Sequence, residues 1–242
     1  NMKSYLRFLS RNKLYTAIEV VGLSVALAFV LIIGSYVWQE YSISRENPDY
    51  ERIYIPTQSM PYGIFEPMKE QIPEIEKITL VNSFDDVVME CDDERLVTRG
   101  LAVRGDFFDI FDYEFLIGDA GCLESYTDIV ISESYAAKLA GKPELAVGMK
   151  IVPVDYPSQA YTVTGVIKDF DHNYWKYMDF ICKGESPLND SAQKNPIFTL
   201  SATAFIKVAE SADVDSLEGK IQAIFEQLWG EKMKAAMIDQ FT

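Results

Sequence analysis

The side chains most able to do chemistry in this 242-residue sequence are few and far apart. The single histidine, His172, lies within residues 168–173 (KDFDHN). A zinc site needs further histidine or cysteine ligands, and no second histidine or nearby cysteine accompanies His172. A Ser-His-Asp hydrolase would also need this histidine, but the Gly-x-Ser-x-Gly turn that presents a nucleophilic serine is missing. We therefore expect His172 to be a surface or loop residue.

Two further patterns lack the residues that ion or nucleotide sites need. Residues 92–95 (DDER) are acidic, but the spaced ligands and the glycine of a calcium-binding loop are missing, so we interpret them as a solvated turn. Neither GxxxxGKS nor GxxxxGKT occurs, so the chain cannot hydrolyse ATP by a P-loop mechanism. The sequence therefore predicts a protein that is not an enzyme and that holds no metal and no cofactor.

Three cysteines, Cys91, Cys122 and Cys182, could carry redox chemistry. Three cannot all pair within one chain, and none shows a CxxC spacing. One disulfide and a set of free thiols both fit the sequence, with buried free thiols the more ordinary outcome.

Residues 174–180 (YWKYMDF) form the aromatic run that looks most exposed. Tyr174 and Tyr177 can face one way while Trp175 and Phe180 face another. We name Tyr174, Trp175 and Tyr177 as a candidate partner surface. A strand packed on one side would explain the same pattern.

Charge divides the chain sharply. Residues 1–38 carry four basic side chains and one acidic one, whereas residues 39–242 carry 18 basic and 36 acidic side chains. A region this acidic repels phosphate backbones, so nucleic-acid binding is not expected. With 48% hydrophobic residues the chain is not disordered, and the acidic region should fold around a proper core.

Residues 20–37 form an uncharged run of 18 residues, which as a helix spans roughly 27 Å and nearly matches the hydrocarbon thickness. Tyr15 and Trp38 supply aromatic anchors at its two ends, so we predict a transmembrane helix over 15–38. The tripeptide at 26–28 (ALA) fits signal-peptide cleavage, but the apolar run exceeds the usual length of such a segment. A soluble core helix would show a polar face, and none is present.

Residues 1–14 should lie along the inner membrane face. Tyr5, Leu6 and Leu9 continue an apolar face of helical spacing that begins at Met2, which predicts a short interfacial helix. All four early basic residues precede the span, so the N-terminus is expected in the cytoplasm and residues 39–242 outside, at the inner (cytoplasmic) membrane.

Glu19 is the one acidic residue of the apolar stretch. It lies about one turn inside Tyr15, so it can reach back to the cytoplasmic interface. It could instead contact another transmembrane helix, which the small residues Gly22 and Ser24 would allow to approach. Both interpretations stay open.

Downstream, strand and helix patterns intermix, which predicts an α+β fold. Strands are expected at 75–84, 128–131, 150–154, 160–167 and 203–208, and a hairpin at 87–98 follows a turn at Asp85 and Asp86. Helices are expected at 62–72, from the N-cap Ser132 to residue 140, and after a capping box at Asp215 and Glu218. The last helix should bury one face, formed by Leu217, Ile221, Ile224 and Leu228. The aromatic cluster within 107–115 should be core.

Several stretches occur in a characteristic order, namely 11–13 (RNK), 17–18 (AI), 22–24 (GLS), 50–54 (YERIY), 73–76 (PEIE), 107–111 (FFDIF) with 118–119 (GD), 130–134 (VISES) running on to Gly148, and 161–170 (YTVTGVIKDF). Together they resemble the MacB-like periplasmic core domain of FtsX/MacB-type ABC transporter permeases. The resemblance covers nearly the whole chain, although the family often has Asn where Glu19 stands.

The resemblance implies a permease whose first transmembrane helix leads into a periplasmic domain at 39–242, made of a porter-like subdomain and an inserted subdomain at roughly 86–170. It implies association with an ATP-binding cassette ATPase and the membrane, as a homodimer or pseudo-dimer. Such a subunit is non-catalytic and transmits ATP-driven motion across the membrane to move or extract a substrate. The alternative is a single-pass membrane-anchored sensor or ligand-binding protein.

We expect the native protein to retain its apolar segment, because that segment is longer than a typical signal-peptide core. Intact-mass measurement on protein extracted from membranes should therefore find the residues that precede position 28. A freely soluble polypeptide that begins after Ala28 would contradict this prediction.

Overall fold

The computed structural model describes residues 13–43, 49–56, 60–92, 94–169, 175, 177–184 and 201–239. The chain divides into two compact units, Asn1–Glu46 and Asn47–Thr242. The predicted interfacial residues Tyr5, Leu6 and Leu9, together with His172 and Tyr174, lie outside the described residues.

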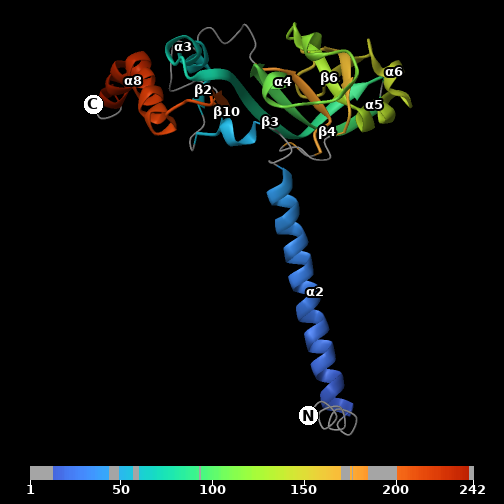
Figure 1. Cartoon of the computed structure of the whole chain (residues 1–242). Coiled ribbons are helices and arrows are strands. Elements are labelled where there is room, and N and C mark those ends of the chain that lie inside the picture. Colours follow the sequence, from blue (N-terminus) through green and yellow to red (C-terminus); the bar gives the residue numbers. More distant parts are fainter. Residues whose placement is uncertain are drawn as a thin grey trace. The chain divides into compact units, whose positions relative to one another are not determined.

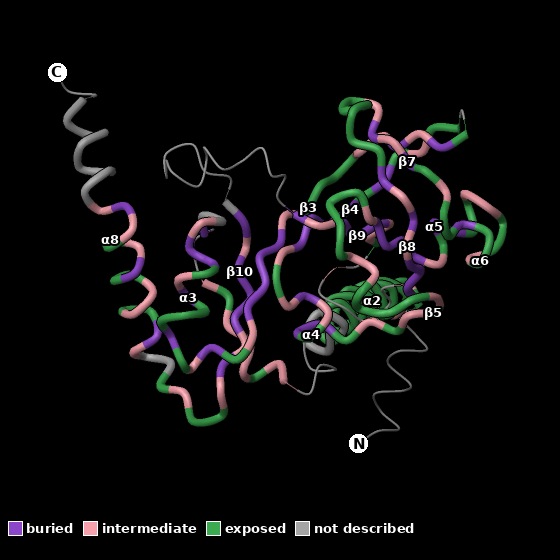
Figure 2. Tube along the Cα trace, turned by 90° about the horizontal axis from the view of Figure 1, so that it is seen from above, coloured by how far each residue is buried: buried purple, intermediate pink, exposed green. Residues whose placement is uncertain are grey.

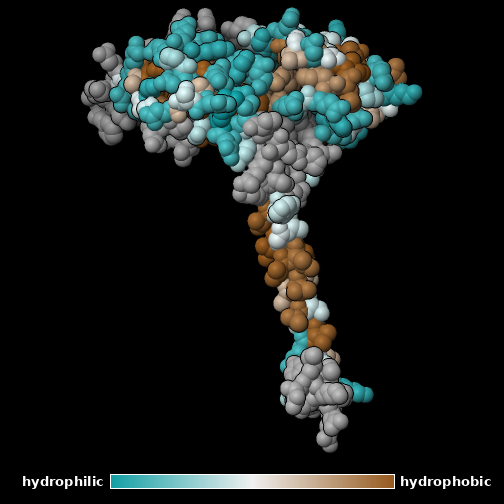
Figure 3. Space-filling model, viewed as in Figure 1, coloured by the Kyte–Doolittle hydropathy of each residue, from teal (hydrophilic) through white to brown (hydrophobic). Residues whose placement is uncertain are grey.

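The first unit contains helix α2 (Lys13–Ile43). Over Lys13–Trp38 this helix is long and apolar enough to cross a membrane, and none of its most apolar window is buried by protein. Figure 3 shows the apolar surface along it. Its polar interruptions are few, and the Ser24 hydroxyl donates a hydrogen bond to the Val20 carbonyl within the helix at 2.7 Å. A continuous helix of this kind satisfies its own backbone groups, as a lipid environment requires.

The second unit is built on one mixed sheet (Figure 1). Its elements in chain order are η2 (Tyr50–Arg52), β1 (Ile53–Tyr54), β2 (Met60–Pro61), η3 (Tyr62–Ile64), α3 (Phe65–Gln71), β3 (Ile75–Cys91), β4 (Glu94–Gly105), α4 (Phe107–Ile110), β5 (Phe115–Ile117), η4 (Ala120–Leu123), β6 (Asp128–Ser132), α5 (Glu133–Ala140), α6 (Pro143–Ala146), β7 (Lys150–Pro153), β8 (Tyr161–Ile167), β9 (Phe180–Lys183), β10 (Ser201–Val208) and α8 (Val214–Asp239). The expected α+β fold, an apolar helix followed by a mixed-sheet domain, is confirmed.

The strand order is β1-β10-β3-β4-β9-β6-β8-β5, with β2 beside β10. Strand β7 pairs with both β3 and β8, so the six strands β3, β4, β9, β6, β8 and β7 close into a ring. Each of the six contributes buried apolar side chains to one core cluster, among them Met89, Ala102, Ile129, Ile151, Val163 and Phe180. Ring closure leaves these strands few open edges.

A second cluster fills the other end of the unit. Helix α3 packs there against β3, and α8 packs against α3 and η3 within the same cluster (Figures 1 and 2). The predicted face of the last helix is confirmed, because Leu217 and Ile224 are buried and Ile221 and Leu228 pack against the same cluster. However, α8 begins at Val214, so Asp215 lies inside its first turn and not at the expected N-cap.

A third cluster joins the two ends through aromatic side chains. Phe107 stacks on Tyr113, and Phe111 packs edge-on against Phe205 of β10 at 5.1 Å between ring centroids. The prediction that the aromatic cluster within 107–115 is core is therefore confirmed. The boundaries of the expected inserted subdomain at 86–170 stay a prediction, since β3 passes without a break through its first boundary.

The expected turn at Asp85 and Asp86 is wrong. These residues lie within the 17-residue strand β3, and the register on β4 shifts between Phe84 and Val87. Asp86 has a φ of 56°, in the left-handed region that Asp tolerates better than most residues. The pair therefore forms a bulge that bends a continuous strand and does not end it.

Helix α5 follows its local signals closely. The Ser132 hydroxyl accepts a hydrogen bond from the Tyr135 N–H at 3.2 Å, and Gly141 ends the helix with a φ of 75°. The prediction of a helix between these two residues is confirmed.

Gly100 on β4 marks a close approach inside the ring. The space that a Cβ would take at Gly100 is filled by the ring of Phe180, a residue that is itself buried. By contrast, a Cβ at Gly219 in α8 would meet no atom within 4 Å.

We expect the two Gly→Ala substitutions to have opposite effects. Gly100→Ala overpacks the ring and should lower the free energy of unfolding by about 1–3 kcal/mol. Gly219→Ala adds a good helix former in open space and should raise it by about 0.5–1 kcal/mol. Urea unfolding followed by tryptophan fluorescence in detergent would measure both, and a stability-neutral Gly100→Ala would refute the packing assigned to Phe180.

Candidate functional site

The described members of the predicted aromatic surface point in different directions. The side chain of Tyr177 is 75% exposed, and its backbone φ of 64° lies in the left-handed region. Trp175 instead packs edge-on against Phe205 at 5.6 Å between ring centroids and belongs to the third core cluster. Of these two residues, Tyr177 alone is placed to meet a partner, and the assignment of a partner surface stays a prediction.

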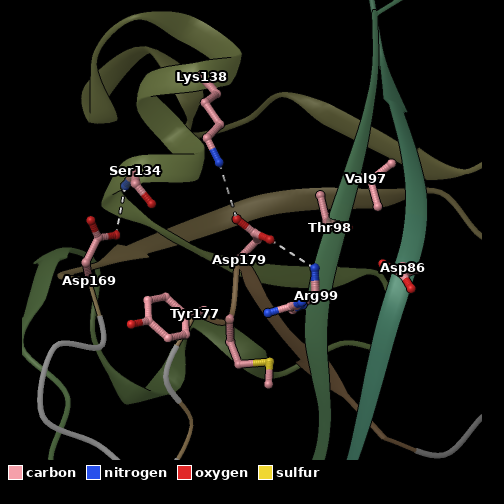
Figure 4. Close-up of a pocket in the computed structure, with 10 residues that line it drawn as sticks. Asp86, Val97, Thr98, Arg99, Ser134, Lys138, Asp169, Tyr177 and Asp179 are labelled. Carbon is pink, nitrogen blue, oxygen red and sulfur yellow. Dashed lines mark hydrogen bonds and ion pairs between the residues drawn. The ribbon is translucent and has the colours of Figure 1, made fainter. Parts of the chain in front are cut away.

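Tyr177 lines a pocket of about 490 Å³. The pocket lies between β3, β4, α5 and the segments that follow β8 and precede β9 (Figure 4). Its lining residues are Asp86, Val97, Thr98, Arg99, Ser134, Lys138, Asp169, Tyr177, Met178 and Asp179. Both signs of charge and three apolar side chains therefore meet in one cavity.

Asp179 extends the β4–β9 pairing with its side chain. The Arg99 N–H donates to Asp179 Oδ2 at 2.9 Å, and the Asp179 N–H donates to the Arg99 carbonyl at 2.7 Å. Lys138 Nζ lies 3.8 Å from Asp179 Oδ1 (Figure 4). A carboxylate thus stands at the point where the β4–β9 ladder begins.

Asp169 fixes the opposite wall of the pocket. Its Oδ1 accepts a hydrogen bond from the Ser134 N–H in the first turn of α5 at 2.9 Å. A carboxylate at a helix N-terminus is favoured by the helix dipole. The segment after β8 is therefore held to α5.

The lining residues offer hydrogen bonds, charges and apolar contact, which suit binding. Within the described parts of the chain, no three His, Cys, Asp or Glu side chains gather closely enough to hold a metal. The Ser134 hydroxyl lies 3.4 Å from the Ser132 hydroxyl. Sequence patterns did not reveal this pocket, because its walls come from five segments up to 93 positions apart.

All three cysteines are free thiols in the structure, and Cys91 and Cys182 are buried. Burial raises the pKa of Cys182 to about 11. Its thiol is therefore protonated at neutral pH and poorly reactive.

The predicted membrane residues of α2 are exposed. Tyr15 and Trp38 have relative exposures of 71% and 76%, and Glu19, Gly22 and Ser24 are also exposed in this chain. A Cβ at Gly22 would meet no atom within 4 Å. The roles of these residues as membrane anchors and helix contacts stay predictions.

The first described residues of the second unit are held by an ion-pair group that we call the Asp49 cluster, made of Asp49, Arg52, Glu76 and Lys207. Arg52 Nη2 lies 2.5 Å from Asp49 Oδ1, and Arg52 Nη1 lies 3.0 Å from Glu76 Oε2. Lys207 of β10 pairs with the other oxygen of Asp49. The hydrogen bond from Lys207, and then that from Arg52, lowers the pKa of Asp49 below its ordinary 3.8.

A related ion pair holds α8. Lys220 pairs with Glu74, and its hydrogen bond lowers the pKa of Glu74. Glu74 and Glu76 flank the start of β3, so one short segment takes part in both groups. Sequence spacing gave no sign of these contacts, because their partners lie up to 158 positions apart.

The family described as the MacB-like periplasmic core domain matches residues 16–224. A domain of a protein described as a permease, from Porphyromonas gingivalis, superposes with a TM-score of 0.62 at 20% identity, covering 75% of this chain and 83% of that one. The periplasmic region of MacB from Actinobacillus actinomycetemcomitans gives a TM-score of 0.51 at 13% identity, with coverages of 75% and 84%. These two likenesses show a shared fold, and no curated protein matches the sequence significantly.

The Asp49 cluster makes stability depend on pH. The pKa of Asp49 in the folded protein lies below its ordinary value of 3.8. The ionised carboxylate therefore adds to the free energy of unfolding above pH 3.8, and this added stability is lost as the pH falls through the folded pKa. We expect Asp49→Asn to lower the free energy of unfolding at pH 7 by about 0.5–1 kcal/mol, with the difference from wild type shrinking below pH 3.8. Urea unfolding at several pH values would measure this difference.

Asp155→Asn serves as the matched control, since Asp155 is exposed. It should leave the pH profile unchanged. A wild-type advantage over Asp49→Asn that persists at the acid end would contradict the assignment.

Proposed function

The chain belongs to the family of the MacB-like periplasmic core domain, and from this we propose that it supplies the first transmembrane helix and the extracytoplasmic domain of an ABC-type transporter permease that works without catalysis. The family match over residues 16–224 is the observation that carries the proposal. The exposed apolar helix α2, followed directly by a folded domain, agrees with it.

We infer that the N-terminus lies in the cytoplasm and the acidic second unit outside the inner membrane. All four basic residues of the first 38 precede the apolar run, as the positive-inside rule requires. The subunit would associate with an ATP-binding cassette ATPase and assemble as a homodimer or pseudo-dimer. Glu19, Gly22 and Ser24 would then face a neighbouring helix.

The proposed work is mechanical. ATP-driven motion would reach the second unit through the covalent chain that follows α2, and Asp49 is the first described residue on that path. The Asp49 cluster ties this point to β10 and β3, and the Lys220–Glu74 pair ties α8 to the same end of β3. Displacement of the connecting segment would therefore move the sheet as a body, which is the behaviour needed to move or extract a substrate.

The pocket beside Tyr177 favours the second candidate function, that of a single-pass anchored sensor or ligand-binding protein. The coding sequence downstream discriminates between the two candidates. Three further apolar spans support the permease, and a stop codon directly after Thr242 supports the sensor.

We expect the full-length gene product, solubilised in mild detergent, to co-purify with an ATP-binding cassette subunit and with ATPase activity. The 242-residue chain alone should show no ATPase activity, because it lacks a phosphate-binding loop. Replacement of the P-loop lysine in the partner should abolish hydrolysis, whereas His172→Ala should leave it unchanged. Repeated purification without any ATP-binding subunit would refute the permease assignment.

A further inference from the structure

Strand β4 has an edge that is only partly used. On one side it pairs with β3 along most of its length, from Glu94 to Gly105. On the other side its pairing with β9 begins at Gly100. Among the residues that the structure describes, no strand pairs with residues 94–99 on this second side.

The backbone groups of Val97 point to this unpaired side. Arg99 uses both its N–H and its carbonyl to contact Asp179, which precedes β9. Residues two apart in a strand direct their backbone groups to the same side. The N–H and carbonyl of Val97 therefore face the same way as those of Arg99, and the Val97 side chain is 66% exposed.

The pocket that Tyr177 lines lies beside this edge of β4. Val97, Thr98 and Arg99 form one wall, and Lys138 of α5 lies across from them (Figure 4). Its volume of about 490 Å³ falls within the range of binding clefts, which runs from about 300 to 1,000 Å³. An open strand edge thus borders a cavity that is large enough to admit a ligand.

We propose that the pocket binds an extended peptide segment of an extracytoplasmic partner protein, which adds a strand to β4 beside Val97. The extracytoplasmic location of the partner rests on the proposed function, and the open strand edge determines the chemistry that the partner must present. Alternating N–H and carbonyl groups at strand spacing are matched by another extended polypeptide.

The pocket also determines where the added strand ends and which side chains it can have. Asp179 already occupies the Arg99 N–H, so the added strand stops before Arg99, next to the ammonium group of Lys138. Val97, Met178 and Tyr177 give the cavity an apolar side. A segment that alternates apolar and polar residues fits this surface, because successive side chains of a strand face opposite ways.

A suitable probe is a fluorescein-labelled hexapeptide of alternating valine and threonine. Its binding to the 242-residue chain in lipid nanodiscs would be measured by fluorescence anisotropy. Val97→Pro removes the outward N–H and should weaken binding about tenfold or more. Val97→Thr retains that N–H and should bind within about twofold of wild type.

Two controls distinguish the loss of backbone hydrogen bonds between the peptide and β4 from unfolding of the protein and from binding through side chains alone. Thermal unfolding of Val97→Pro should match wild type, because the lost N–H does not face β3. A hexapeptide N-methylated at its central residues should lose binding if the backbone is what the edge recognises.

Several outcomes would overturn the proposal. These are no binding of the probe at millimolar concentration, equal binding by Val97→Pro, and equal binding of the N-methylated peptide. A dimer in sedimentation that Val97→Pro dissociates would assign the edge to a second copy of the chain instead. Co-purification of the ATPase with Val97→Pro should be unchanged, so failure of peptide binding and failure of the permease assignment give distinct results.

Discussion

The second unit depends on the pairing of β3 with β4. Strand β3 reaches the core clusters at both ends of the unit, and every other strand is joined to β3 or β4 directly or through a neighbouring strand. β10 and β7 bond to β3, while β9 bonds to β4 and carries β6 and β8 with it. The core clusters at the two ends of the unit share β3, with Ile78 in one and Met89 in the other. Loss of this pairing would therefore remove the support of both cores together.

The features that could be predicted from the sequence are those with local causes. The uncharged run in α2, the Ser132 cap and Gly141 stop of α5, and the apolar face of α8 all depend on residues within a few turns of one another. The bulge at Asp86 could not be predicted in this way. Two adjacent aspartates usually signal a turn, but β4 supplies partners on both sides of them and keeps the strand continuous.

The candidate site shows the same division. Tyr177 was identified from its aromatic neighbours and is exposed, whereas Trp175 from the same run packs on Phe205, a residue 30 positions away that local pattern cannot reveal. The pocket walls and the Asp49 cluster are likewise products of sheet topology. Lys207 reaches Asp49 only because β10 pairs with β1, which places Lys207 opposite Ile53. Single-sequence reasoning has no access to such pairings.

Glu74 and Glu76 receive ion pairs from the two peripheral segments of the second unit, Asp49–Arg52 through Arg52 and α8 through Lys220. The segment Asp49–Arg52 and the start of α8 are consequently held at neighbouring points at one end of β3. Loss of the three residues 74–76 would therefore release both segments together, whereas α5 and α6 at the distant end would keep the contacts of their own core cluster.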